Sequence, residues 1–129
     1  MDYSFKKLNE INGVTTFYTK PSTIHQYNTA EEVLKDYTDL LDHIGSNKWK
    51  WIIDGDGFEI KYALEMKTGM GVAKLLTGSH GDNLQEIKII NPSLFIRAIL
   101  QVLLPILNTN TRKKVKIYSD RYYSLLEFL

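Results

Sequence analysis

Residues 86–107 read EIKIINPSLFIRAILQVLLPIL and decide the fold class of this chain. The first six residues are a short run rich in isoleucine, which predicts a buried strand over 86–91. Asn91-Pro92-Ser93 follows as a helix-start pattern and predicts a helix from there to about Asn108. A buried strand that leads directly into a helix is the repeating unit of an α/β sheet.

The residues before this stretch predict a hairpin and a first helix. Asn12-Gly13 lies between two strand-like runs, 5–11 and 14–19, and this dipeptide favours a tight hairpin turn. Thr29 and Glu32 form a capping-box pattern that begins a helix, and Gly45 is suited to end it. The hairpin would add an antiparallel strand at one edge of the sheet.

The remaining segments complete the alternation of strands and helices. A strand is predicted over 49–54 and a helical stretch over 60–76. Gly69 and Gly71 are expected to split that helix, because glycine costs about 1 kcal/mol inside a helix. A last strand over 115–119 and a terminal helix over 122–129 follow. We therefore predict a single α/β domain over residues 1–129, with a mostly parallel four- to five-stranded sheet, an N-terminal antiparallel hairpin strand and helices packed on it.

Composition limits the classes of function. The chain has 129 residues, no cysteine and a formal net charge of +1. Disulfides, thiolate zinc sites and iron–sulfur clusters are therefore excluded, and the charge balance argues against a dedicated nucleic-acid binder. No run reaches the roughly 18 apolar residues of a membrane span, and the N-terminus has no signal-peptide core. A cytoplasmic protein is expected.

The predicted helix is unusually apolar over residues 94–107. Only Arg97 and Gln101 are polar, and their spacing of four residues makes one narrow polar stripe, whereas a surface helix normally hides a single face. Pro105 is expected to kink the helix near Gln101. Unless the helix is an ordinary core element, its excess apolar surface must be covered by a partner, a membrane or a ligand beneath it.

Residues 80–95, HGDNLQEIKIINPSLF, resemble the CRAL-TRIO lipid-binding domain family. In that family a turn of the form Tyr-Pro-Glu-Asn/Arg-Leu leads into a strand that ends Ile-Ile-Asn-(Ala)-Pro, in which the alanine is optional. A phenylalanine and then a long apolar helix follow. The similarity extends through residues 107–117, where the family has Leu-x-x-x-Thr-x-x-Lys-Ile. It also includes residues 51–57, which resemble the family's Ile-Val-Asp-x-x-Gly strand end.

The resemblance implies that a lipid or another small hydrophobic molecule is held between the sheet and the helix over 94–107, which acts as a gate at the membrane. It implies binding, with transfer as an extension, and no covalent chemistry. We therefore expect no catalytic residues, no cofactor and no metal. The candidate ligand-binding residues are Phe95, Ile99, Leu103 and Ile106 from the resemblance, together with Phe58 and Met70.

A basic cluster follows the apolar helix. It consists of Arg112, Lys113, Lys114 and Lys116. Each basic group contributes about 1 kcal/mol near an anionic membrane surface, so these residues are candidate contacts to lipid headgroups. The protein is then expected to be a cytoplasmic one that meets membranes peripherally; a solvated turn is the alternative interpretation.

A second resemblance competes with the first. The hairpin followed by α/β alternation also resembles the STAS domain, a protein-interaction module. Thr68 would stand near the position at which that family carries a phosphorylatable serine. Under this alternative the apolar helix would be a partner face, and a homodimer through that face is one form of it.

Enzymatic and metal-binding interpretations are weaker. Residues 54–57, DGDG, resemble the opening motif of haloacid-dehalogenase-type phosphotransferases. That motif requires Thr or Val where this chain has Phe58, and a late acidic pair for Mg²⁺ where Asp120 stands alone. The histidines His25, His43 and His80 are widely separated in the sequence, so no metal site is predicted from them.

Overall fold

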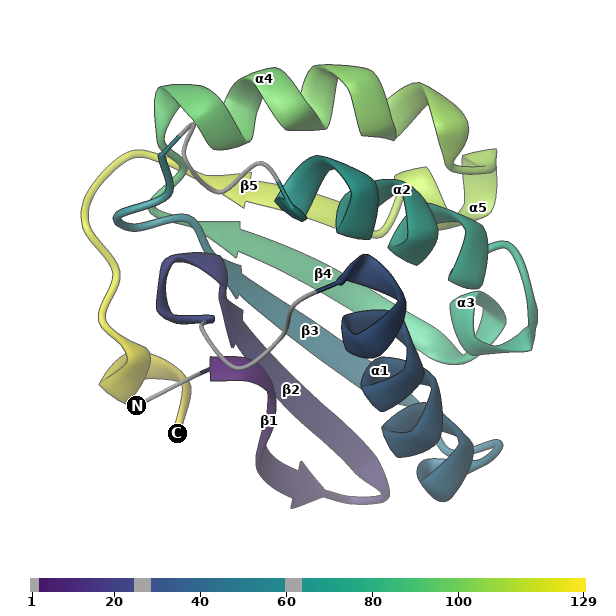
Figure 1. Ribbon diagram of the computed structural model, residues 1–129. Coiled ribbons are helices and arrows are strands. Elements are labelled where there is room, and N and C mark those ends of the chain that lie inside the picture. Colours follow the sequence, from purple (N-terminus) through teal and green to yellow (C-terminus); the bar gives the residue numbers. More distant parts are fainter. Residues whose placement is uncertain (1–2, 25–28, 60–63) are drawn as a thin grey trace.

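The computed structural model describes residues 3–24, 29–59 and 64–129, which form a five-stranded sheet with helices on one face (Figure 1). The strand order β1-β2-β3-β4-β5 follows the chain. The first pair is antiparallel and the later pairs are parallel, which confirms the predicted α/β sheet with a hairpin at one edge. The strands are β1 (Tyr3–Ile11), β2 (Val14–Lys20), β3 (Trp49–Asp54), β4 (Leu84–Ile90) and β5 (Val115–Tyr118).

The turn between β1 and β2 is the one that the sequence predicts. Asn12 and Gly13 both have positive φ, 53° and 79°. A two-residue turn of this kind has the twist that two antiparallel strands need, and asparagine followed by glycine adopts it at low cost.

Three helices cover the same face of the sheet: α1 (Ala30–Ile44), α2 (Leu64–Leu75) and α4 (Leu94–Leu103) (Figure 1). Two short helices, α3 (Ser79–Asn83) and α5 (Thr109–Arg112), precede β4 and β5, and neither was expected from the sequence. The parallel strands follow one another across the sheet without a reversal. Because such crossovers are right-handed, each one returns over the same side, and the opposite face receives no helix from a crossover.

The ends of α1 confirm the predicted caps. The Thr29 side chain accepts a hydrogen bond from the Glu32 backbone N–H at 3.3 Å, so one of the free amide groups of the first turn is satisfied. Gly45 ends the helix with a positive φ of 62°, a conformation that glycine adopts without strain.

Helix α2 corrects the prediction of a split at its glycines. It runs without interruption through Gly69 and Gly71, and residues 60–63 of the predicted stretch lie outside the described part. A Cβ atom on Gly71 would lie 2.2 Å from Leu34 Cδ1, and one on Gly69 would lie 2.6 Å from Leu103 Cδ1. The two glycines therefore let α2 pack closely against α1 and α4, and this packing offsets their low helix propensity.

The apolar helix is also shorter than predicted. α4 ends at Leu103 and continues as the 3₁₀ helix η2 (Leu104–Ile106), so the change of direction falls after Leu103 and not near Gln101. Pro105 has no N–H to donate to the Gln101 carbonyl, which ends the α-helical hydrogen bonding. A further 3₁₀ turn, η1 (Pro21–Thr23), follows β2.

The predicted terminal helix is reduced to the 3₁₀ helix η3 (Leu125–Phe128). The reason is a pair of hydrogen bonds that holds Tyr123 in place. Its N–H donates to Asn91 Oδ1 at 2.8 Å, and its carbonyl accepts from Asn91 Nδ2 at 2.8 Å. The helix therefore begins only after these two hydrogen bonds, with Ser124 as its N-cap.

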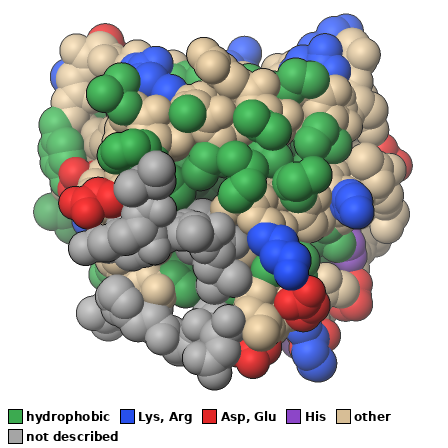
Figure 2. All heavy atoms as spheres, turned by 45° about the horizontal axis from the view of Figure 1, so that its top comes forward, with side chains coloured by type: hydrophobic (Ala, Val, Ile, Leu, Met, Phe, Trp, Pro, Cys, Tyr) green, Lys and Arg blue, Asp and Glu red, His purple; other side chains and the backbone are tan. Residues whose placement is uncertain are grey.

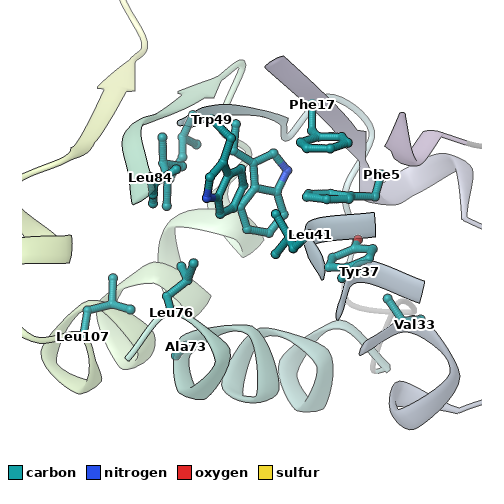
Figure 3. Close-up of a cluster of buried hydrophobic side chains, with 13 residues drawn as sticks. Phe5, Phe17, Val33, Tyr37, Leu41, Trp49, Ala73, Leu76, Leu84 and Leu107 are labelled. Atoms are coloured by element: carbon teal, nitrogen blue, oxygen red, sulfur yellow. The ribbon is translucent and has the colours of Figure 1, made fainter. Parts of the chain in front are cut away.

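The main core lies between the helices and the sheet (Figure 3). It is centred on aromatic rings: Phe5 stacks on Phe17 with ring centroids 4.2 Å apart, and Tyr37 stacks on Phe5 at 4.5 Å. Trp49 and Trp51 lie beside them with ring centroids 5.9 Å apart. Aromatic pairs of this kind stabilise a core beyond their buried area.

A smaller cluster covers part of the opposite face. Tyr18, Ile52 and Ile90 are buried there, and Tyr123 and Phe128 of the C-terminal segment pack against them. Asp54, at the end of β3, accepts a hydrogen bond from the Tyr18 hydroxyl at 2.6 Å. The C-terminal segment therefore supplies the cover that no crossover helix supplies on this face.

We expect Tyr18 to make stability depend on alkaline pH. Burial, followed by the hydrogen bond and the charge of Asp54, raises the pKa of Tyr18 well above its ordinary value of 10.0. Above about pH 10 the unfolded chain therefore releases this proton while the folded chain keeps it, and the free energy of unfolding falls by up to about 1.4 kcal/mol per pH unit. Urea unfolding at a series of alkaline pH values should show a steeper fall for the parent than for Tyr18→Phe; equal slopes would contradict this account.

Candidate functional site

An apolar cavity of about 120 Å³ lies between the sheet and α4. The sheet contributes the side chains that β2, β3 and β4 turn toward the helices, and α2 and α4 form the opposite wall. This arrangement follows from strand alternation, because every second residue of a strand faces the same side. The lining residues are Thr19, Pro21, Tyr37, Trp51, Ile53, Phe58, Thr68, Gly69, Val72, Ile89, Ile96, Ile99, Leu100 and Leu103.

A second cavity of about 70 Å³ adjoins the first. The two share part of their lining, including Trp51, Ile53, Ile89 and Leu103, and the second extends toward Leu107 at the end of η2. Together they form a row of apolar space along the length of α4. Apolar space of this kind favours apolar ligands over water, which needs two to four polar partners.

The polar groups at the edge of the first cavity are occupied by one another. Trp51 Nε1 donates to Thr19 Oγ1 at 2.8 Å, and Thr19 Oγ1 donates to the Ser4 carbonyl at 2.6 Å. The Tyr37 hydroxyl donates to the same carbonyl at 2.8 Å. Because their donors are used within the protein, these side chains add little demand for a polar ligand group.

Three of the six predicted ligand-binding residues line the first cavity: Ile99, Leu103 and Phe58. The other three, Phe95, Met70 and Ile106, are not part of either lining and are 41%, 40% and 40% exposed. The structure thus brings the first group together at the cavity and leaves the second group on the surface.

The floor of the cavity was not predicted from the sequence. Trp51, Ile53 and Ile89 were quoted only as parts of family motifs, and Val72 of α2, on the opposite wall, was not singled out. The available signal was alternation: Trp49, Trp51 and Ile53 share a face of β3, as Ile87 and Ile89 share a face of β4. That pattern indicates which face of each strand is buried, but not where on that face a cavity lies.

Helix α4 is attached to the domain by few buried groups. Within this helix, which is described throughout, Ile96 is the only buried residue. Leu94 and Val102 on its outer side are 82% and 51% exposed. Figure 2 shows hydrophobic side chains gathered on this face with lysine and arginine side chains near its margins. None of the helices in the described part of the chain is long and apolar enough to span a membrane.

The four residues of the basic cluster have different surroundings. Arg112 donates to the carbonyls of Leu104 and Leu107, at 3.1 and 2.8 Å, and so caps the end of η2. Lys114 donates to the Gly81 carbonyl at 2.8 Å. Lys113 and Lys116 are exposed. Half of the cluster therefore holds backbone elements together, and the other half faces solvent.

The aspartate of the phosphotransferase-like motif is fully engaged in structural contacts. Asp54 is buried, its Oδ2 accepts from Tyr18, and its Oδ1 accepts from the Asp56 backbone at 3.0 Å and from Asn91 Nδ2 at 3.1 Å. Thr68, the position suggested by the STAS resemblance, is buried in α2 against the cavity. Among the described residues, no three His, Asp or Glu side chains gather into a metal site.

Comparison with protein families agrees with this architecture. The family model of the CRAL/TRIO domain matches residues 14–129. The chain belongs to the CRAL/TRIO family, and this membership implies a hydrophobic ligand. A search of curated proteins found no match.

Proposed function

We propose that this protein binds a lipid or another small apolar molecule between its sheet and α4, without a covalent step. The observation that carries the proposal is the pair of adjoining apolar cavities beneath a helix that has one buried residue. Ile99 and Leu103 form the helix side of the site, and Phe58 also lines it.

The size of the cavity limits what it holds in this conformation. An enclosed apolar cavity of about 150 Å³ binds benzene, so the first cavity, of about 120 Å³, suits a ring or a short chain segment. A longer chain needs α4 to move outward. Burial of each methylene contributes about 0.8 kcal/mol, and this gain offsets the loss of the few contacts that α4 makes.

Toluene is a suitable first probe because it is close in size to the cavity. We expect titration of the methyl-labelled protein with toluene to give saturable chemical-shift changes at Ile53, Ile89 and Ile99. Changes that grow linearly without saturation would overturn the proposal, because they indicate solvent effects and not a site.

We also propose that the outer face of α4 meets an anionic membrane while the ligand enters or leaves. The face carries exposed Leu94, Val102 and Arg97. Lys113, which is also exposed, directly follows the short helix α5. Binding to phosphatidylcholine vesicles should rise when phosphatidylserine is added and fall with salt, because surface attraction is screened over about 10 Å at 0.1 M. Cosedimentation of the protein with vesicles measures this.

A pair of variants makes the membrane experiment specific. Arg97→Ser with Lys113→Ser should weaken vesicle binding, whereas Lys7→Ser, at the far edge strand β1, should not. Arg112 and Lys114 are left intact because their backbone contacts would confuse docking with stability. If the face instead joins two copies of the chain, the parent will elute as a dimer and will ignore both lipid charge and these substitutions.

A further inference from the structure

The sheet face turned away from the helices carries a groove of about 460 Å³. This volume is within the range of about 300 to 1,000 Å³ that is common for ligand pockets, whereas the cavity under α4 is smaller. Thr16, Lys50, Ile52 and Lys88 belong to its floor strands, and Ile11 and Phe128 stand at its sides. The groove exists because the C-terminal segment covers only part of this face.

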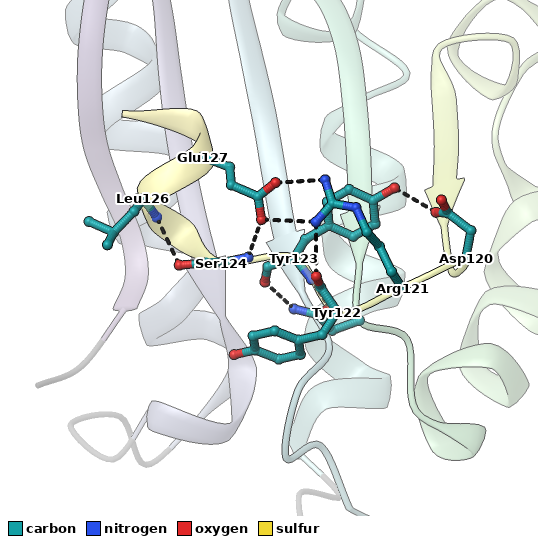
Figure 4. Close-up of polar contacts among 8 residues, drawn as sticks. Asp120, Arg121, Tyr122, Tyr123, Ser124, Leu126 and Glu127 are labelled. Carbon is teal, nitrogen blue, oxygen red and sulfur yellow. Dashed lines mark hydrogen bonds and ion pairs between the residues drawn. The ribbon is translucent and has the colours of Figure 1, made fainter.

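The wall formed by η3 is held firmly in place (Figure 4). Arg121 donates to both oxygens of Glu127, at 2.7 and 3.2 Å. Glu127 also accepts from the Ser124 backbone at 2.8 Å, which completes a capping box. Lys88 Nζ lies 5.5 Å from the centre of the Phe128 ring. One side of the groove is therefore a preorganised wall.

Two lysine side chains contribute positive charge to the groove. Lys50 and Lys88 come from neighbouring strands and form no ion pair within the described residues. The acidic residue of the lining, Glu127, is already paired, and its hydrogen bond with Arg121 lowers its pKa. Next to the groove, Glu86 stands opposite Lys50 and Lys116 stands opposite Lys88 in the strand register, so these two flanking charges offset each other.

We propose that this groove binds a small anionic amphiphile, with a carboxylate head at Lys50 and Lys88 and an apolar body against Ile52, Phe128 and Ile11. Paired ammonium groups in a partly apolar groove attract a single anionic head, and the aliphatic and aromatic side chains accept its chain. The site lies on the opposite face of the sheet from the cavity under α4. The proposal for this groove therefore does not depend on whether the cavity under α4 binds a ligand.

Octanoate is the probe, and 1-octanol is its neutral counterpart. In titrations followed by backbone NMR, octanoate should give saturable shifts at Lys50, Ile52, Lys88 and Phe128. Lys50→Met with Lys88→Met, which keeps most of the length of both side chains and removes their charge, should weaken octanoate binding by at least about tenfold. 1-Octanol carries no charge. It should therefore bind the parent protein at these residues as weakly as octanoate binds the double variant, or more weakly.

Lys116→Met is the matched control. It removes one lysine from the same sheet face, next to Lys88 but outside the lining, and should change octanoate binding by less than about twofold. Three outcomes would overturn the proposal: octanoate shifts confined to Ile99 and Leu103, equal binding by the parent and the double variant, or an equal loss in Lys116→Met. Backbone spectra of all variants verify that they are folded.

Discussion

Replacing Gly81 by alanine is expected to lower the free energy of unfolding by about 3 kcal/mol or more, which places it among the severe single substitutions. A Cβ atom at this position would lie 1.8 Å from the Leu76 carbonyl oxygen and 2.7 Å from its carbon. These are backbone atoms at the end of α2 and cannot rotate away. Relief requires α3 to move as a whole, which would disturb the hydrogen bond from Trp49 Nε1 to the His80 carbonyl.

Urea unfolding of Gly81→Ala beside Gly78→Ala measures this effect. A Cβ on Gly78 would meet nothing nearer than 3.8 Å, so that control should change stability by less than about 1 kcal/mol. Similar small losses for both variants would show that the packing between α2 and α3 is looser than described.

The double variant Ile99→Phe with Leu103→Trp is expected to weaken toluene binding by at least about tenfold, the equivalent of about 1.4 kcal/mol. Both side chains line the first cavity, and Leu103 also lines the second. The added atoms enter space that a ligand would use, so the stability loss should stay below the 1 to 3 kcal/mol that is typical of overpacking a filled core.

Val102→Trp provides the matched control for the filled cavity. Val102 is next to Leu103 in the sequence, is 51% exposed and lines neither cavity. It adds bulk to the outside of the same helix and should leave toluene binding within about twofold. A much lower melting temperature of the double variant would show that α4 covers a packed core. A shift from dimer to monomer as the only effect of the double variant would show that α4 is a partner face.

Local signals in the sequence predicted much of the fold. Asn12-Gly13, the Thr29 cap and Gly45 each act through their own backbone or through neighbours a few residues away, so they can be recognised without knowledge of the tertiary structure. The predicted split of α2 at Gly69 and Gly71 was wrong because it depends on residues that are distant in the sequence. Their cost in helix propensity is local, but the benefit comes from Leu34 and Leu103, which are distant in the sequence.

The candidate site was predictable in part for the same reason. Ile99 and Leu103 lie on one helix, and their helix was recognisable from its composition. Ile53 and Ile89 lie on the apolar faces of β3 and β4, whereas Lys50 and Lys88 lie on the opposite faces. This alternation indicates the buried face, but only the position of α2 and α4 shows where on that face the cavity lies. Phe95 and Ile106 are as apolar as their neighbours, and their exposure follows from the orientation of α4 and from the 3₁₀ turn at Pro105.

The position of a bound apolar molecule tests the central claim most directly. Isotope-filtered NOE spectra of the toluene-saturated protein report which methyl groups lie next to the probe. We predict NOEs from toluene to the methyl groups of Ile53, Ile89 and Leu103, which only a molecule between the sheet and α4 can contact together. NOEs confined to Leu94 and Val102, on the outer face of α4, would contradict the account.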